Sequence, residues 1–348
     1  MAKEKNVNEG FNMLKVAIKN KQPDRLYFFF GEEDFLKNYY FERLKKILLD
    51  DLTESFNFHK LTNENFDIHT FADAVENLPM MAEHTLVLVE DIDIFKLPED
   101  ERTKMSDILS DIPDYCTVVF YYLTVEWKAD KRYKKLFDVV EQTGIAVDFA
   151  KQDQRDLISW ITRHFAASGK TISQDLCIYL IDITGGTMTA LAGEISKICA
   201  FSGADKINRS DIDAVTEPVL DAVAFQMTDC FGQKNYAGAL DKLHQLLKMQ
   251  EAPLSILGAI GSHFRRLGVA RTLVDNGRNY SDYMRIYGGG EYYAKKMITA
   301  CRHFSAPFYA KANEMIMETD RKMKTSFDEP ERLLELLLLQ LTQEARNG

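Results

Sequence analysis

Four short apolar runs in the first 150 residues predict a buried parallel sheet. The runs are Leu26–Phe30, Thr85–Val89, Thr117–Tyr122 and Ile145–Phe149, the last of them interrupted by Asp148. Apolar side chains at successive rather than alternate positions are typical of strands that are covered on both faces. Between the first two runs, apolar residues recur at helical spacing over residues 35–48. Because alternating strands and helices need crossover connections, residues 1–150 are expected to form an α/β domain with a mainly parallel sheet.

From residue 151 onward the pattern is helical. Ser173 is a suitable N-cap for a helix that Gly185-Gly186 would end, and residues 151–216 are expected to form a small helical domain. Residues 217–348 predict helix after helix, and the last helix has leucine at seven of the nine positions from Leu333 to Leu341. A helix that is apolar nearly all round needs cover on several sides, in a bundle core or at a subunit interface.

The net charge limits the nucleic-acid functions that the chain can have. A formal charge of −10 over 348 residues opposes broad non-specific DNA binding, which needs a cationic surface. One short segment is strongly basic, with five cations in eight residues: Lys128, Lys131, Arg132, Lys134 and Lys135. These side chains form either a solvated helix face or a contact with DNA phosphates or a neighbouring subunit.

Several classes of protein are excluded by what the chain lacks. Its five cysteines are far apart and its seven histidines are scattered, so we expect no disulfide framework, no metal site and no hydrolase centre. The polar N-terminus is not a secretory signal, and no stretch approaches the ~18 to 20 apolar residues that span a bilayer. We therefore expect a cytoplasmic protein without a membrane contact.

The first strand, the glycine after it and the following helix form the setting of a phosphate-binding loop. Gly31 and Lys37 occupy the first and seventh positions of the pattern G-x-x-x-x-G-K-[ST]. Leu36 stands at the second glycine and Asn38 at the hydroxyl that would bind magnesium. The segment Glu32–Asp34 adds three carboxylates, which repel one another and any polyanion by roughly 4 kcal/mol per pair at ~4 Å. We expect that ATP does not bind here and that the chain has no cofactor.

Two further segments agree with that expectation. Glu90-Asp91, after the second strand, resembles an acidic Walker B end in reversed order, although two acids after a strand also occur in simple surface turns. Gly185–Leu191 resembles the sensor 2 segment of AAA+ lid domains, with Met188 where an arginine would contact the γ-phosphate. The scaffold looks like that of an ATPase without the parts that handle ATP.

Short segments along nearly the whole chain resemble the delta subunit family of bacterial DNA polymerase III. Their order and spacing carry the resemblance: Tyr27–Glu33, Leu78–Met81 before Leu86–Val89, Asp130–Arg132 with Lys134, Gly186–Leu191 with Glu194 and Lys197, Phe264-Arg265, and Asp320 with Lys324-Thr325. The resemblance implies an AAA+-like α/β domain, a small helical lid domain and a C-terminal helical collar domain.

The resemblance also implies a function without catalysis. Family members bind the ring-shaped sliding clamp, the beta subunit, and open it for loading on primed DNA. Partner motor subunits of the loader bind and hydrolyse ATP, and a delta-prime-type subunit is a further partner. The assembled loader encloses primer–template DNA and belongs to a complex classed as a DNA-directed DNA polymerase (a nucleotidyltransferase). The family's apolar wedge, which enters a pocket on the clamp, corresponds here to Leu78, Pro79, Met80 and Met81. Family members often have aromatic residues at the last two positions, and methionine also suits adaptable apolar pockets.

Three alternatives stay open at this point. Met80 and Met81 could be ordinary core residues that lead into the second strand. The chain could be an ATP-hydrolysing AAA+ motor subunit of a clamp loader, against which the degenerate loop at Gly31–Asn38 speaks. It could also be an unrelated helical scaffold with a nucleotide-free Rossmann-like domain, which would not bind a clamp.

Overall fold

The chain forms two compact units, Met1–Lys151 and Gln152–Gly348. The computed structural model describes residues 3–288 and 291–347. The first unit ends one residue beyond the α/β domain expected from the sequence. The expected boundary after residue 216 lies inside the second unit and stays a prediction.

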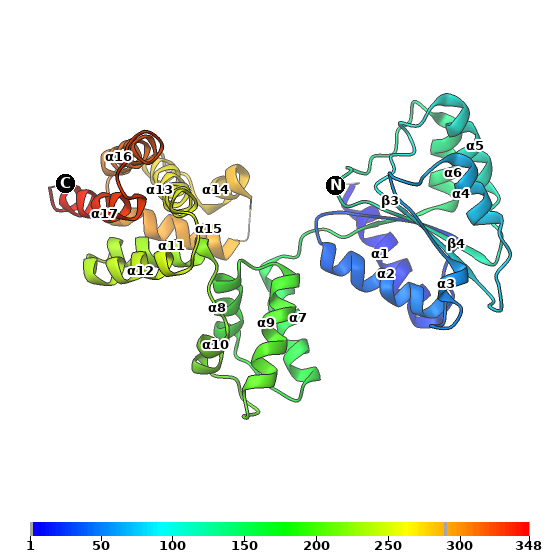
Figure 1. The fold of residues 1–348 in the computed structure, drawn as a ribbon, viewed down its shortest axis with the longest axis horizontal. Coiled ribbons are helices and arrows are strands. Elements are labelled where there is room, and N and C mark those ends of the chain that lie inside the picture. The colour runs from blue at the N-terminus through cyan, green and yellow to red at the C-terminus, as the bar shows by residue number, and fades with distance from the viewer. Residues whose placement is uncertain (1–2, 289–290, 348) are drawn as a thin grey trace. The chain divides into compact units, whose positions relative to one another are not determined.

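The first unit is built on a parallel sheet (Figure 1). Within the described residues its strands are β1 (Leu26–Phe30), β2 (Phe58–Leu61), β3 (Thr85–Glu90), β4 (Cys116–Tyr121) and β5 (Ile145–Asp148). They lie in the order β2-β3-β4-β1-β5, and every neighbouring pair is parallel. The expected α/β class and parallel sheet are confirmed. The edge strand β2 has no counterpart in the sequence prediction.

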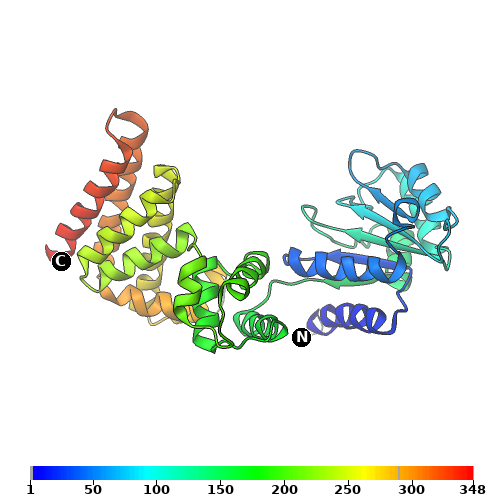
Figure 2. The same ribbon diagram turned by 60° about the horizontal axis from the view of Figure 1, so that its bottom comes forward.

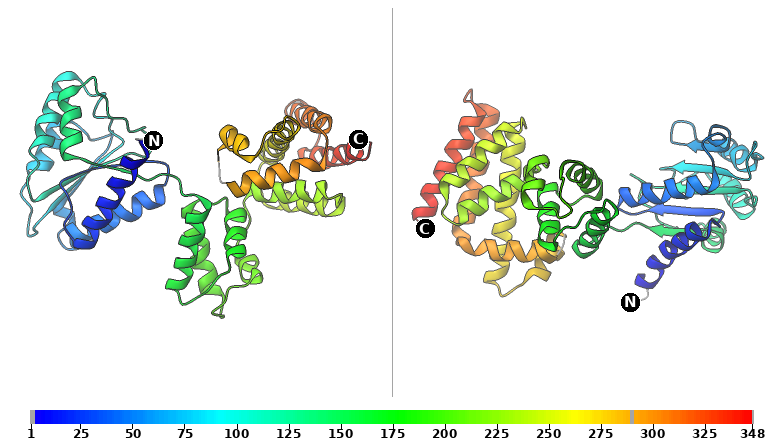
Figure 3. Two further views of the ribbon diagram at one scale, coloured as in Figure 1. Left: turned by 180° about the vertical axis from the view of Figure 1, so that it is seen from behind. Right: turned by 90° about the horizontal axis from the view of Figure 1, so that it is seen from below.

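Helices cover both faces of this sheet, which explains its continuous apolar strands (Figure 3). The helices are α1 (Lys3–Asn20), α2 (Asp34–Leu48), α3 (Glu54–Asn57), α4 (Ile68–Glu76), α5 (Glu99–Ser110) and α6 (Lys134–Thr143). Tyr27 and Phe29 of β1 pack with α1 and α2 in one core. Leu26 and Phe28 face the opposite core, with side chains of α4, α5 and α6.

In the part that the structure describes, the second unit consists of helices and their connections, with one isolated parallel bridge between Thr171 and Lys206. Its first helices are α7 (Gln154–Ala167), α8 (Gln174–Thr184), α9 (Met188–Phe201) and α10 (Arg209–Val215). Ser173 caps α8 by accepting a hydrogen bond from the Leu176 amide at 3.4 Å, and Gly185 ends the helix with a φ of +77°. The expected start and stop of this helix are therefore confirmed.

The remaining helices follow without a strand between them in the described residues. They are α11 (Leu220–Gly232), α12 (Tyr236–Lys248), α13 (Pro253–Asp275), α14 (Tyr280–Tyr287), α15 (Glu291–Ala300), α16 (Ala306–Thr325) and α17 (Pro330–Asn347), with a 3-10 turn at Cys301–His303. Together with the first unit they confirm the α/β plus all-α fold class.

The leucine-rich helix α17 is covered mainly by its own chain. It packs on α12, α13 and α16, and Figure 2 shows it in red beside α16. Five of the seven leucines are buried there, whereas Leu336 is 44% and Leu339 is 61% exposed. The exposed apolar surface of α17 is therefore limited to one narrow face, and the rest of the helix is covered within the chain.

No single helix in the described residues is long and apolar enough to cross a membrane. The pair α8 and α9, bent by 119°, meets the length and composition test only when the two helices are taken together.

Candidate functional site

The loop between β1 and α2 is held tightly against the end of β5. Gly31 has a φ of +108°, and a Cβ atom there would lie 2.5 Å from the carbonyl oxygen of Phe149. The Glu33 amide donates a hydrogen bond of 2.9 Å to the same oxygen. The loop thus approaches β5 too closely for any side chain at position 31.

Lys37, the lysine of the degenerate loop, is fully buried. It lies on the inner face of α2 with Phe41 and Leu44. Its Nζ donates a hydrogen bond to the carbonyl oxygen of Tyr122 at 2.8 Å, and the Asp34 carboxylate pairs with it at 2.8 Å. The ammonium group is therefore neutralised inside the protein and does not face a ligand at the loop. Sequence reasoning did not foresee this burial.

Carboxyl groups surround the start of α2. Glu32 and Asp34 are exposed, and burial raises the pKa of Glu33 above its ordinary value. Burial, together with the charge of Glu32, also raises the pKa of Asp148 at the end of β5. A helix N-terminus ordinarily attracts anions, but these groups surround it with negative charge.

The other two positions of the loop offer little to a nucleotide. Leu36 is half-buried against the core, and Asn38 is exposed on α2. The four residues of the degenerate loop thus have different structural roles. Gly31 allows a close backbone approach, Leu36 makes an apolar contact, Lys37 forms an internal ion pair, and the amide of Asn38 faces solvent.

Asp91 serves as a loop anchor. Its backbone has a φ of +56°, and its carboxylate accepts hydrogen bonds from the amides of Leu123, Thr124 and Val125 at 2.7 to 3.2 Å. Burial opposes the charged form, but these hydrogen bonds outweigh it and hold the pKa of Asp91 below its ordinary value. The adjacent Glu90 pairs with Lys60 at 2.8 Å. Both acids thus have structural partners, as in the surface-turn interpretation.

Met188 belongs to the second unit, where it is 1% exposed at the first position of α9. Its side chain is part of the interior of the helical unit. The Thr187 hydroxyl caps the helix by accepting from the Ala190 amide at 3.3 Å.

A second candidate site is the apolar loop between α4 and β3. Leu78 is 74%, Met80 57% and Met81 93% exposed, and Pro79 is half-buried. Met81 also has a φ of +55°, which is uncommon for a residue with a side chain. These methionines therefore do not belong to the core, which removes that alternative for them.

The backbone of this apolar loop is fixed by a buried asparagine, Asn57, at the end of α3. Its Oδ1 accepts from the Met80 amide at 2.7 Å, and its Nδ2 donates to the Met80 carbonyl oxygen at 2.9 Å. The same Nδ2 donates to the Thr53 carbonyl oxygen at 3.0 Å. The Asn57 side chain thus pairs with both backbone groups of Met80, as a neighbouring strand would. No pattern in the sequence marks Asn57, because its partner lies 23 residues away.

The five cations of the basic segment are all exposed, but they are not equally available. Arg132 pairs with Asp130 at 2.6 Å, and Lys135 pairs with Asp107 at 2.6 Å. Within the described residues, Lys128, Lys131 and Lys134 form no ion pair within 4 Å. The nearby Trp127 stacks on Phe28 and Tyr122 in the core and is not a stacking platform for bases.

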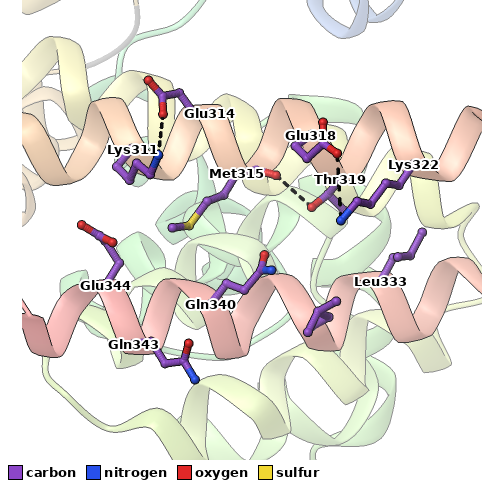
Figure 4. Close-up of a pocket in the computed structure, with 11 residues that line it drawn as sticks. Lys311, Glu314, Met315, Glu318, Thr319, Lys322, Leu333, Gln340, Gln343 and Glu344 are labelled. Atoms are coloured by element: carbon purple, nitrogen blue, oxygen red, sulfur yellow. Dashed lines mark hydrogen bonds and ion pairs between the residues drawn. The ribbon is translucent and has the colours of Figure 1, made fainter.

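A groove of about 470 Å³ runs between α16 and α17 (Figure 4). Its lining mixes charged, amide and apolar side chains: Lys311, Glu314, Met315, Glu318, Thr319, Lys322, Leu333, Leu336, Gln340, Gln343 and Glu344. Lys311 and Glu314 pair across one turn of α16 at 2.9 Å. Such a surface suits contact with another polypeptide better than it suits catalysis. Among the described residues, no three His, Cys, Asp or Glu side chains are grouped as metal ligands.

The comparisons with known proteins agree with this architecture. Residues 27–150 match the family described as "DNA polymerase III, delta subunit", and residues 221–341 match "DNA polymerase III delta subunit, C-terminal domain". DNA polymerase III subunit delta of Bacillus subtilis is 23% identical over 93% of this chain and 95% of its own length. The probable DNA polymerase III subunit delta of Aquifex aeolicus is 21% identical over 80% of this chain and 79% of its own length.

A solved structure shares the whole fold. The Bacillus subtilis DNA clamp loader delta protein superposes with a TM-score of 0.68 at 20% identity, covering 96% of this chain and 99% of that protein. The AAA+-like fold expected from the sequence is thereby confirmed. The two family matches together span most of the chain, and the chain belongs to the DNA polymerase III delta subunit family.

Proposed function

We propose that this chain is a clamp-loader subunit that binds the sliding clamp and opens it without hydrolysing ATP. Family membership supports the general role. The single observation that carries the proposal is the loop of Leu78, Met80 and Met81, whose apolar side chains are 57% to 93% exposed. Large apolar side chains gathered on a surface mark interaction sites. The loop backbone is fixed by Asn57, so little ordering is needed on binding.

Opening a ring requires that the open state is bound more tightly than the closed one. Burial of each apolar side chain stabilises a complex by roughly 1.5–3 kcal/mol. This binding free energy favours the open clamp only by the amount by which it is larger for the open clamp than for the closed one. Equal affinity for the two states would leave the equilibrium between them unchanged. The proposal therefore requires a pocket on the clamp that is better formed, or less strained, when the interface between the clamp's own subunits is open.

The experiment is a clamp titration with the Met80→Ser/Met81→Ser variant. Loss of two buried thioether side chains should weaken clamp binding by about 3–5 kcal/mol, which is a few-hundred-fold or more in Kd. The melting temperature should stay nearly unchanged, because neither side chain is in the core. Val16→Ser is the matched control: Val16 is 57% exposed, like Met80, but lies on α1, which packs on β5 at the other edge of the sheet.

Normal clamp affinity in the folded double variant would remove the loop from the site. Binding that is lost equally in Val16→Ser would point to a non-specific effect of surface polarity.

ATP chemistry is proposed to belong to other subunits. The buried Lys37, paired with Asp34, and the carboxylates around the start of α2 support this. No observation favours the alternative of a motor subunit.

We further infer that the helices beyond residue 217 assemble with the motor and delta-prime-type subunits in a collar. The exposed Leu336 and Leu339 and the groove between α16 and α17 support this role. Primer–template DNA enclosed by the loader would meet the basic segment through Lys128, Lys131 and Lys134, because Arg132 and Lys135 already have acidic partners.

A further inference from the structure

Two more large apolar side chains are exposed close to the Leu78–Met81 loop. Leu52 is 88% and Phe56 is 56% exposed, on the segment that contains α3. Neither belongs to a core cluster, and no pattern in the sequence sets them apart. Single exposed apolar residues are common on protein surfaces, so their position relative to the loop decides whether they matter.

Asn57 makes the two segments direct neighbours. Its single Nδ2 atom donates both to the Thr53 carbonyl oxygen, next to Leu52, and to the Met80 carbonyl oxygen, next to Met81. Phe56 directly precedes Asn57 in the chain. The exposed side chains of the α3 segment therefore flank the residue that holds the loop.

The α3 segment is held as firmly as the loop. The Asp50 carboxylate accepts from the amides of Leu52 and Thr53, both at 2.9 Å. Glu54 pairs with Lys45 of α2 at 2.6 Å. A surface whose backbone is fixed before binding loses little conformational entropy when a partner covers it.

We propose that Leu52 and Phe56 form one composite apolar face with Leu78, Met80 and Met81, and that the clamp covers both segments. This rests on the proposed function. The clamp is the occupant because Asn57 joins the α3 segment to the loop that is proposed to enter the clamp's pocket. The exposed acids Asp51 and Glu83 lie in the same two segments, and the exposed Glu76 ends α4 just before the loop. The matching surface on the clamp is therefore an apolar pocket with a neutral or basic edge.

The test compares clamp affinity of the full-length protein and of Leu52→Ser, Phe56→Ser and Met80→Ser/Met81→Ser, with Val16→Ser as the control. Leu52→Ser and Phe56→Ser should each raise Kd about tenfold or more. The melting temperature should not move, since Leu52 is almost fully exposed. Asn57→Ala should also raise Kd and should speed amide hydrogen exchange at Met80, whose N–H would lose its acceptor.

The outcomes separate this inference from the proposed function. Clamp binding lost in the methionine variant but normal in Leu52→Ser and Phe56→Ser would overturn the composite face and leave the loop in place. Normal binding in the methionine variant would remove the loop from the clamp site and overturn the composite face with it, whereas a wild-type protein that does not bind the clamp would overturn the proposed function itself. Sedimentation of the free protein gives a third result: a dimer abolished by Leu52→Ser, with unchanged clamp affinity, would assign the α3 segment to self-association and overturn the inference.

Discussion

Lys37 shows how one residue can keep its place in a motif and lose the motif's chemistry. A phosphate-binding lysine must present its ammonium group to a ligand, but Lys37 is 0% exposed and bound to Asp34 and the Tyr122 carbonyl. A buried charge is tolerated only when partners compensate for the water that it has lost. Lys37 is thus a structural element of the β1–α2 junction.

The Asp34→Ala variant tests that assignment. Removing the carboxylate should cost about 1–2 kcal/mol of unfolding free energy, below the range for fully buried pairs because Asp34 is 67% exposed. In a Lys37→Met background the same change should cost almost nothing, because no charge is left to compensate. Urea unfolding followed by Trp127 fluorescence, with Trp160→Phe throughout, reports on the first unit. Equal costs in both backgrounds would contradict the internal ion pair.

Asp91 makes the stability of the first unit depend on pH. Its pKa is lower in the folded protein than the ordinary value of 3.8. The charged form therefore stabilises the fold above that ordinary value, and this contribution is lost as the pH falls through the lower folded-state pKa. Asp91→Asn should cost about 1–2 kcal/mol at pH 7 through weaker hydrogen bonds to the 123–125 loop. Asparagine also tolerates the positive φ at this position.

The measurement is urea unfolding of both proteins from pH 7 down to pH 3. The difference between the two free energies of unfolding should narrow below the ordinary pKa of 3.8, because there the unfolded carboxylate takes up a proton more readily than the folded one. A gap that is constant with pH would show that the Asp91 charge does not contribute.

At the scale of elements, the sequence predicts the helices and strands that have a clear hydrophobic periodicity. It does not predict features that depend on contacts between residues far apart in the chain. Four strands and the α8 stop at Gly185 follow from local pattern and turn chemistry. The strand β2 escaped because Phe58-His-Lys-Leu61 is short and partly polar, as an edge strand can be. The exposed loop at Met80 could be named only through family resemblance. Its support by Asn57 depends on a contact across 23 residues that no spacing rule contains.

The exposed face of α17 is the element to test for assembly. Deleting the whole helix would expose the core that Leu334, Leu337 and Leu341 fill, so loss of assembly would be uninformative. Leu339→Glu with Leu336→Glu should instead leave the melting temperature nearly unchanged and weaken binding to the other loader subunits at least tenfold. Leu254→Glu, at a residue that is 44% exposed on α13, is the matched control. Full assembly of the double variant would exclude this face from the collar.

At the scale of the whole molecule, the proposed division of labour predicts that the isolated chain does not bind ATP. Carboxylates surround the N-terminus of α2 at the degenerate loop, and Lys37 cannot turn outward without breaking two contacts. Equilibrium titration with a labelled ATP analogue and magnesium should show no saturation at micromolar concentrations. Saturation of either kind would contradict the prediction. If Lys37→Met abolished it, the nucleotide would bind at the degenerate loop, and if it persisted in that variant, the nucleotide would bind elsewhere on the chain.

The internal ion pair of Lys37 also bears on timing. The ammonium group of Lys37 is bound to Asp34 and to the Tyr122 carbonyl oxygen, so it cannot respond to the binding or release of a nucleotide. The apolar loop is fixed by hydrogen bonds between Asn57 and Met80, which do not involve the degenerate loop. Under the proposed function, the neighbouring loader subunits must then determine when the clamp is bound and when it is released, by covering or uncovering the loop.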